Sequence, residues 1–373
     1  KTFPLVLKHD FFGVISGYIF DYAWNHVKQG NRDEKYGDMV NCAYAISKLM
    51  NNLPDMKLYR NYFFREFNQN EEVDMEPQYH YTSPDGFLSI VKNNCLRFTD
   101  ISFLNDVSES IYMLKVICDY FCEYPQKFPR VEEAFFEMIK ENKPEDIANL
   151  NVREVKYQLP LPIIKQRQFV FCMCNECDKL NMWNYYVNNG VYQGYNIGFN
   201  VQELIRSFDV EEDILDSFLV YYGNVLYKKA EQYKFLKNRF KKLEEVHKND
   251  ENLNHLTIKL RMFIDSFCAF FKHPKFEEEK EFRIVIEIAD ARIPRTDNHF
   301  VGPYNKKMKY DFYTKNGLII PCLYVKINKQ SFSRITVSPI MEAEITKMSI
   351  RELLSTNGYK GCRVYQSTIP IRF

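Results

Sequence analysis

The sequence has almost no net charge, no long apolar run and none of several motifs that mark common enzyme classes. Lys and Arg total 50 against 49 Asp and Glu, so no global field would steer the protein to nucleic acid or acidic lipid. Asp21 interrupts the best candidate for a membrane span, at 14–23. Gly-x-Gly-x-x-Gly, Gly-Lys-Ser/Thr and Gly-x-Ser-x-Gly are all absent, which argues against a Rossmann dehydrogenase, a nucleotide triphosphatase and a serine hydrolase of the α/β type.

The cysteines lack the short, even spacing of a disulfide framework. Ten of them are spread over 373 residues, so we expect reduced thiols and a cytoplasmic protein. The opening residues carry His9 and Asp10 before any small-residue cleavage site, so we expect no secretory signal. Tryptophan is scarce, with Trp24 and Trp183 alone.

A polar stretch near 68–77 divides the chain. We assign residues 1–76 to a helical N-terminal segment and 77–373 to one α+β domain. The apolar spacing before the boundary predicts three helices, at 10–29, 33–49 and 56–67.

After the boundary, short strand patterns alternate with amphipathic helices, as in an α+β domain. A highly charged helical hairpin is expected as an insertion at about 228–272. The strand patterns fall at 78–82, 95–100, 169–173, 192–199, 281–288, 318–327, 334–337 and 362–371. The helical patterns fall at 86–94, 106–121, 130–150, 182–187, 230–271 and 342–355.

Several short motifs keep a common order through the second part of the chain. They are Tyr79-His80-Tyr81-Thr82-Ser83, Phe103-Leu104-Asn105-Asp106 with Glu109, Met182-Trp183 with Tyr186, Phe276 followed by Glu279-Lys280-Glu281-Phe282-Arg283, Ser338-Pro339, and Ser367-Thr368-Ile369-Pro370-Ile371-Arg372. In this order they resemble the bacterial domain-of-unknown-function family twenty-nine seventy-one. The resemblance spans nearly all of residues 79–372.

A more distant resemblance follows from His80-x-Thr82 on a strand, with Leu96-Arg97 read as the end of the next helix. It is similar to the first half of the NAD-binding core of ADP-ribosyltransferases. That resemblance implies a split β-sheet core of two small sheets, with NAD as co-substrate in the cleft. It also implies that His80 contacts the adenosine ribose, that Thr82 lies beside the ribose, and that the backbone at Tyr81 holds the nicotinamide amide.

Glu279 and Glu281 carry the chemistry in this interpretation. We expect both to lie two residues apart on one strand and so to share a face, where Arg283 can offset their repulsion. Cleaving the nicotinamide–ribose bond develops an oxocarbenium-like centre that a carboxylate stabilises. We expect Glu281 to be catalytic, Glu279 to assist and Arg283 to contribute to NAD binding. A solvated, ion-paired edge strand is the structural alternative.

Trp183 and Tyr186 are three residues apart, which places them on one side of a helical turn. We expect them to form an aromatic wall over a bound ring, although such a pair also suits a hydrophobic core. The residue that stacks on nicotinamide stays open, because Phe98, Tyr185 and Tyr186 compete for that role.

The sequence also contains one candidate for a metal site and one for a nucleic-acid site. Cys172-x-Cys174-x-x-Cys177 lacks a fourth ligand nearby, so we expect no metal. The Lys-rich helix at 228–248 has aromatic residues between its cations, which would suit phosphates and bases. Acidic residues between the cations favour a solvated helix instead. The aromatic residues concerned are Tyr227, Tyr233, Phe235 and Phe240.

The expected function is that of an NAD-dependent ADP-ribosyltransferase that modifies a macromolecule, as a bacterial toxin or an anti-phage defence effector does. One alternative is a non-enzymatic sensor or binding module that engages a protein or nucleic acid. A second is an NAD glycohydrolase. We expect no membrane partner, and the N-terminal helices are candidates for contact with a regulatory partner.

Overall fold

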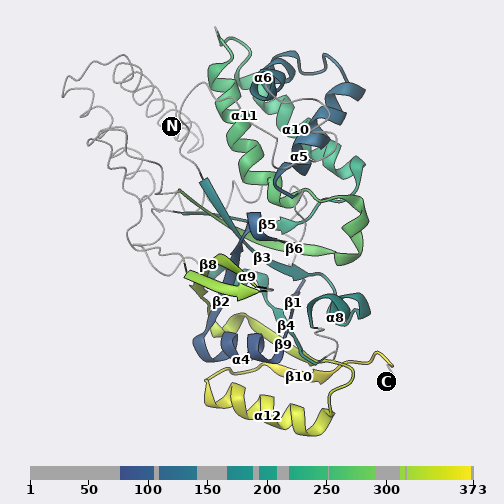
Figure 1. Cartoon of the computed structure of the whole chain (residues 1–373), viewed down its shortest axis with the longest axis vertical. Helices are drawn as coiled ribbons and strands as arrows, with labels where there is room; N and C mark the ends of the chain where they lie inside the picture. The colour runs from purple at the N-terminus through teal and green to yellow at the C-terminus, as the bar shows by residue number, and fades with distance from the viewer. Residues whose placement is uncertain are drawn as a thin grey trace, which may run out of the picture. The chain divides into compact units, whose positions relative to one another are not determined.

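The strands in the described part of the chain form one connected mixed sheet in the computed structural model (Figure 1). The described residues are 76–104, 109–140, 166–187, 193–207, 218–250, 252–289, 311–315 and 317–370. The helices expected at 10–29, 33–49 and 56–67 lie outside these residues, as does the helix start expected at 105–108. The assignment of residues 1–76 to a separate segment therefore stays a prediction.

The ten-stranded sheet follows the order β10-β9-β4-β1-β3-β2-β8-β7, with β6 paired to β3 and β5 paired to β6. The strands expected at 78–82 and 95–100 are confirmed as β1 and β2, whereas β5 and β7 were not predicted. The strands are β1 Gln78–Thr82, β2 Cys95–Asp100, β3 Gln166–Cys174, β4 Tyr195–Phe199, β5 Phe218–Asn224, β6 Glu281–Ala289, β7 Asp311–Lys315, β8 Leu318–Lys326, β9 Phe332–Val337 and β10 Arg363–Gln366.

The sheet forks along one edge of β3. The other edge pairs with β6 from Gln166 to Cys174. On the forked edge, β2 pairs at Phe169 and Val170, whereas β1 pairs at Cys174. The residues at 171–173 therefore lie between two diverging strands. The expected α+β class is confirmed, but the strands form one connected sheet with a fork instead of two separate small sheets.

Helices cover both faces of the sheet. They are α4 Pro84–Asn93, α5 Glu109–Glu123, α6 Pro129–Ile139, α8 Leu180–Tyr186, α9 Val201–Arg206, α10 Lys229–Val246, α11 Asn254–Phe267 and α12 Ala343–Thr356, with short 3-10 helices η1 Ile101–Phe103, η4 Cys268–Phe270, η5 Pro274–Glu279 and η6 Lys329–Ser331. Leu96 and Arg97, expected at a helix end, lie within β2 instead, because α4 already ends at Asn93.

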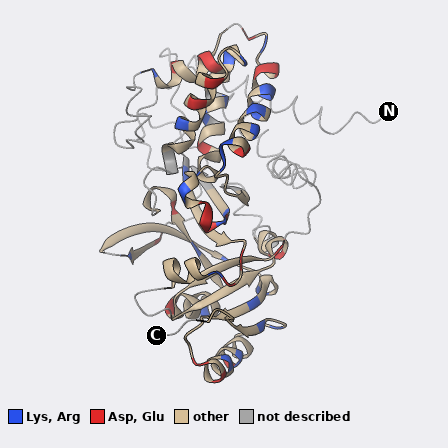
Figure 2. Cartoon of the chain, turned by 90° about the vertical axis from the view of Figure 1, so that its right-hand side faces the viewer, with Lys and Arg blue, Asp and Glu red and all other residues tan. Residues whose placement is uncertain are grey.

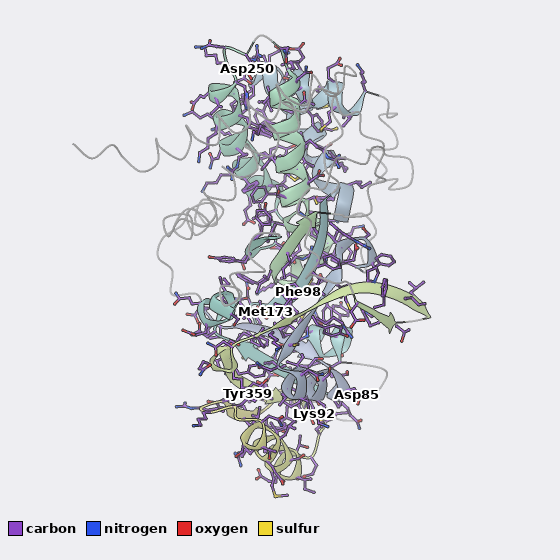
Figure 3. All side chains as sticks on the ribbon, turned by 90° about the vertical axis from the view of Figure 1, so that its left-hand side faces the viewer. Asp85, Lys92, Phe98, Met173, Asp250 and Tyr359 are labelled. Carbon is purple, nitrogen blue, oxygen red and sulfur yellow. The ribbon has the colours of Figure 1, made fainter. Side chains whose placement is uncertain are left out.

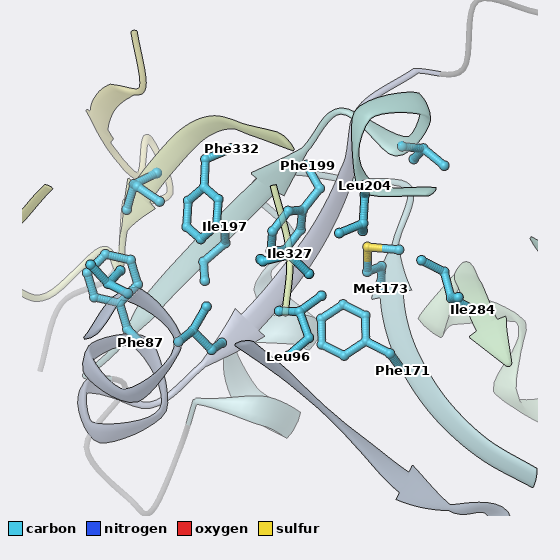
Figure 4. Packing of buried hydrophobic residues seen from close by; sticks show 14 of the residues in the cluster. Phe87, Leu96, Phe171, Met173, Ile197, Phe199, Leu204, Ile284, Ile327 and Phe332 are labelled. Atoms are coloured by element: carbon cyan, nitrogen blue, oxygen red, sulfur yellow. The ribbon is translucent and has the colours of Figure 1, made fainter. Parts of the chain in front are cut away.

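The main hydrophobic core lies on one face of the sheet, beneath α4, α9 and α12. Figure 4 shows Phe87 of α4 and Leu204 of α9 among strand residues that include Phe171 and Ile284. Phe98, also labelled in Figure 3, is completely buried in this cluster. The core therefore joins strands from both sides of the fork.

Local signals at the start of α4 explain the turn that follows β1. The Gly86 amide donates to the Ser83 hydroxyl at 3.2 Å, which caps the helix. Pro84 occupies the first turn, where a missing N–H costs nothing. A Cβ on Gly86 would lie 2.2 Å from Thr82 Oγ1, so the close approach of β1 and α4 requires glycine. This contact fixes Thr82 against the helix.

The second face carries a helical layer of α5, α6, α10 and α11 beside β5 and β6. The hairpin expected at 228–272 is confirmed as α10 and α11, and Asp250 lies between the two helices (Figure 3). The hairpin packs against the other helices of this layer, since Phe240 stacks on Phe121 of α5 with ring centroids 5.2 Å apart. The aromatic side chains of α10 thus pack inside the layer.

Candidate functional site

Glu281 and Arg283 lie on one face of β6, as predicted. Their partners in β3 are Cys174 and Cys172, and directly paired residues share a face. Glu279, however, does not lie on this strand. It ends η5, and Lys280 then adopts a left-handed conformation with φ 42° before β6 begins. The turn, not strand alternation, brings the two carboxylates together.

Four charged side chains form a buried cluster at the start of β6. The Lys272 ammonium contacts Glu279 Oε2 at 2.5 Å and Glu281 Oε2 at 3.4 Å. Arg283 donates to Glu281 Oε2 from Nε at 3.0 Å and from Nη2 at 2.5 Å, and from Nη1 to the Ala269 carbonyl at 2.7 Å. Glu281 is 3% exposed and Arg283 1%. The cluster carries two charges of each sign, which makes its burial tolerable.

The surroundings set the two carboxyl pKa values apart. Burial on its own would raise the pKa of Glu281, but the charges of Arg283 and Lys272 outweigh burial and lower it. Burial and the neighbouring Glu281 raise the pKa of Glu279, and Lys272 offsets only part of this effect. Glu281 therefore stays ionised, whereas Glu279 holds its proton to higher pH. Two neighbouring carboxyl groups with separated pKa values can take different roles as acid and base.

Two tyrosines border the carboxylates. The Glu281 amide donates to the Tyr227 hydroxyl at 3.1 Å. Burial and the negative charges of Glu281 and Glu279 raise the pKa of the Tyr186 phenol, and burial together with Glu281 raises that of Tyr227. Both phenols therefore stay protonated at neutral pH and can donate hydrogen bonds beside the two carboxylates.

His80 is not brought into this cluster. Tyr79 pairs with Cys174, which pairs with Glu281, so alternation along β1 places His80 on the opposite face from Glu281. The imidazole lies in the fork of the sheet, with its ring centroid 4.5 Å from that of Phe171. The structure therefore separates the two residues on which the distant resemblance depends most.

The fork holds His80 in one protonation state. Nδ1 lies 3.0 Å from the Cys172 carbonyl oxygen, which can only accept, so Nδ1 carries the proton. Burial lowers the pKa of His80 to about 4, so the ring is neutral at neutral pH and Nε2 is an acceptor. Such an acceptor suits a ribose hydroxyl, and the role of His80 in binding NAD stays a prediction.

The stability of the protein should fall in acid because of His80. Above pH 6.5 the ring is neutral in the folded and the unfolded chain, and as the pH falls towards 4 only the unfolded chain gains the proton. This difference corresponds to roughly 3 kcal/mol. We expect His80→Gln to lose less stability than the wild type between pH 6.5 and 4 in urea unfolding. Parallel losses in both proteins would contradict this account of the imidazole.

The other expected NAD-binding residues are buried beneath or within α8. Trp183 is completely buried, contacts Tyr81 edge to face at 4.8 Å between centroids, and donates to Asp178 at 2.8 Å. The Tyr81 hydroxyl donates to the Glu176 carbonyl at 2.9 Å. Thr82 is 9% exposed. Tyr186 packs against the cluster that contains Trp183 and Tyr81 and also lies near the carboxylates, whose charges raise the pKa of its phenol.

Sequence reasoning missed Lys272 and Tyr227. Lys272 directly follows the apolar run Cys268–Phe271 and is only 4% exposed. A lysine is almost never buried without a partner. A cation at the end of an apolar run, seven residues before Glu279, could therefore have indicated a buried ion pair with that carboxylate. Tyr227 offered no comparable signal, because its contact with Glu281 depends on the pairing of β5 with β6.

No group of three or more His, Cys, Asp or Glu is arranged to hold a metal ion among the described residues. Cys172 and Cys174 share a face of β3, and Cys172, Cys174 and Cys177 are all free thiols. In the same part of the chain, no helix has the length and apolar character needed to cross a membrane.

Fold and site together define a mixed α+β protein with a buried carboxylate–cation cluster. A family model described as "Protein of unknown function (DUF2971)" matches residues 182–284, which supports the resemblance drawn from the motifs. The matched segment contains Tyr186, Lys272, Glu279, Glu281 and Arg283, whereas His80 lies outside it. No curated protein and no solved structure matches the chain.

Proposed function

We propose that the protein is an NAD-dependent ADP-ribosyltransferase that acts on a macromolecular target through the carboxylates of Glu279 and Glu281. The observation that carries the proposal is the geometry of two neighbouring carboxylates joined through Lys272 at 2.5 and 3.4 Å, in surroundings that raise the pKa of Glu279 and lower that of Glu281. A role as a toxin or an anti-phage effector fits such an activity and is part of the proposal.

The roles of the two carboxylates follow from their surroundings. Glu281 keeps its negative charge, and its contacts to Lys272 and Arg283 all use Oε2. This retained charge is suited to stabilise a ribosyl cation. Glu279, with its raised pKa, is suited to take the proton of the attacking acceptor. The C–N bond breaks with its electron pair on nicotinamide, and the acceptor forms the new bond to the ribosyl carbon.

The proposal does not require His80 at the same sugar. Because the register places His80 and Glu281 on opposite faces, the reaction is assigned to the carboxylate cluster and Tyr186 alone. In an NAD glycohydrolase, water takes the place of the macromolecular acceptor. The same carboxylates would serve either acceptor.

A nucleic-acid-binding role for α10 has weaker support. Phe240 is completely buried, Tyr233 is 9% exposed, and Phe235 stacks on Phe263 with centroids 5.9 Å apart. These rings are therefore not free to stack on bases, contrary to the alternative considered from the sequence. Figure 2 shows Lys and Arg interspersed with Asp and Glu on the helices, the mixed surface of a solvated helix.

Glu279→Gln tests the proposal directly. We expect it to slow release of labelled nicotinamide from NAD by roughly 10²- to 10⁴-fold, the usual contribution of a general base. In the wild type the rate should rise as Glu279 loses its proton, and because its pKa is raised this rise should lie above the range of an ordinary carboxyl. The variant should lose that dependence on pH.

Glu278→Gln is the matched control, because the Glu278 side chain is 71% exposed and pairs with Lys179 at 3.2 Å. It should retain the wild-type rate and pH profile. Equal nicotinamide release from wild type and Glu279→Gln would remove Glu279 from the mechanism. No release from the wild type with any cellular extract as acceptor would end the proposal.

A further inference from the structure

A line of buried polar side chains without partners runs along β9 and its neighbour β4. Asn196 is 0% exposed, and neither its amide nitrogen nor its amide oxygen has a hydrogen-bond partner within the described residues. In the same part of the chain, the hydroxyls of Thr336 and Ser338, 1% and 0% exposed, and the buried Nε of Arg334 also lack partners. Five polar atoms from four side chains are thus left unmatched.

The register gathers these side chains on one face of the sheet. Asn196 of β4 pairs directly with Thr336 of β9. Arg334 and Thr336 alternate to the same face, and Ser338 continues it, because its amide still donates to the Gly194 carbonyl at 3.1 Å. The face also carries Tyr81, which pairs with Asn196 from the other side. The unmatched atoms therefore form one continuous polar surface.

Such a cluster costs the fold stability unless a further molecule satisfies it. A buried polar atom without a hydrogen bond costs about 1–3 kcal/mol, and most such atoms in folded proteins have partners. The face opposite has two cases on separate strands, Gln78 Oε1 and Gln366 Oε1, whose Nε2 atoms donate to the Glu76 carbonyl at 3.1 Å and the Ser338 carbonyl at 2.7 Å. Single unmatched atoms occur elsewhere, but here several lie together on one surface. This clustering points to a ligand.

The chemistry of the surface defines the ligand. An Asn amide offers a donor and an acceptor side by side, the pattern that matches N6 and N7 of adenine. The two hydroxyls each donate and accept, as a ribose requires. The Arg334 guanidinium lies 4.1 Å above the Tyr365 ring and pairs on β10 with Arg363, which provides positive charge for a phosphate.

We propose that Asn196, Thr336, Ser338 and Arg334 bind an adenine nucleotide, with the phosphate towards Arg334. The site lies three to four strands from Glu281, about 14–19 Å away at the usual strand spacing, on the same face of the sheet. The inference does not rest on NAD cleavage at the carboxylates, because AMP binding is measurable by itself.

In this proposal the C-terminal segment at 367–369 limits access to the surface. Ser367 Oγ donates to Asp178 Oδ1 at 2.7 Å, and the Thr368 amide donates to Asp178 Oδ2 at 2.8 Å. The adjacent Ile369 packs against Tyr81 and its hydrophobic neighbours. Because Asn196 is covered in this structure, a nucleotide reaches it when the Asp178 contacts open. Asp178→Ala should therefore speed AMP association.

Isothermal titration calorimetry of the full chain tests the site with AMP, ribose 5-phosphate and inorganic phosphate. We expect saturable AMP binding, weaker binding of ribose 5-phosphate, and at least about a tenfold loss of AMP affinity in Thr336→Val and in Asn196→Leu. Both replacements nearly conserve shape. Gln78→Leu, which removes a buried amide on the opposite face, should bind AMP as the wild type does.

Thermal unfolding without ligand supplies the second readout. If the Thr336 hydroxyl is unmatched until a nucleotide binds, Thr336→Val should keep or raise the melting temperature of the free protein. A lower melting temperature would mean that water already satisfies the hydroxyl, and the proposal would be overturned. Absence of AMP binding, AMP binding no tighter than that of inorganic phosphate, or equal AMP affinity in wild type and both variants would also overturn it.

Discussion

Glu281→Gln is expected to be the most damaging single replacement in the candidate site, lowering the free energy of unfolding by about 3–5 kcal/mol and abolishing nicotinamide release. The carboxylate is 3% exposed and accepts two hydrogen bonds from Arg283 and one from Lys272. A neutral amide would leave two buried cations with Glu279 as their one remaining anion in the cluster. Urea unfolding at pH 7 measures the change in stability.

The dependence on pH distinguishes this cause from a simple packing defect. The pKa of Glu281 is lowered in the folded chain, mainly because Arg283 and Lys272 outweigh burial. Its contribution is therefore present above the unfolded pKa and is lost as the pH falls through the lowered value. The variant should lack this acid-dependent loss. Glu278→Gln, at an exposed position, should change neither stability nor pH dependence, and a similar effect in both variants would contradict the assignment.

The first strands show what the sequence could determine. Gln78–Thr82 and Cys95–Asp100 were predicted with correct bounds, because β-branched and aromatic residues alternate there and turn residues follow β1. The capping residue Ser83 and the proline after it are local signals. By contrast, Phe218–Asn224 was missed, since its continuous apolar run has no period that separates a strand from a helix.

The candidate site could be predicted only in part, because it depends on an uncommon backbone conformation at one residue and on the register of two strands. A left-handed Lys280 is uncommon for a residue with a side chain, so nothing in the sequence indicates that Glu279 lies before the strand. The face of His80 depends on the pairing of Tyr79 with Cys174. A shift of one residue in that register would have placed His80 on the same side as Glu281.

Two contacts could not be predicted from the sequence patterns alone. Lys272 reaches Glu279 and Glu281 through a turn of the chain, and Asn196 reaches Thr336 across paired strands 140 positions apart. Sequence patterns report which residues are polar and where elements begin, but partners at such separations come from the sheet. The order of the motifs identified the segment that carries the carboxylates. Strand pairing and the turn before β6 determine which other residues contact these carboxylates.

Replacing the ion pair as a whole should separate its structural from its chemical role. We expect the double variant Glu281→Leu/Arg283→Met to recover most of the stability that Glu281→Gln loses, because it removes one buried charge of each sign. Lys272 and Glu279, 2.5 Å apart, would remain as a balanced pair. Nicotinamide release should nevertheless stay abolished, since no carboxylate remains at position 281.

The comparison is informative because Glu281→Leu, Arg283→Met and the double replacement form a thermodynamic cycle with the wild type. Arg283→Met alone should be destabilising by a similar amount, since it also leaves the Ala269 carbonyl, now bound by Nη1 at 2.7 Å, without that partner. Unfolding of all four proteins in urea gives the coupling energy between Glu281 and Arg283. A double variant that is stable and still releases nicotinamide would show that the buried pair serves the fold alone, and the catalytic assignment of Glu281 would have to be abandoned.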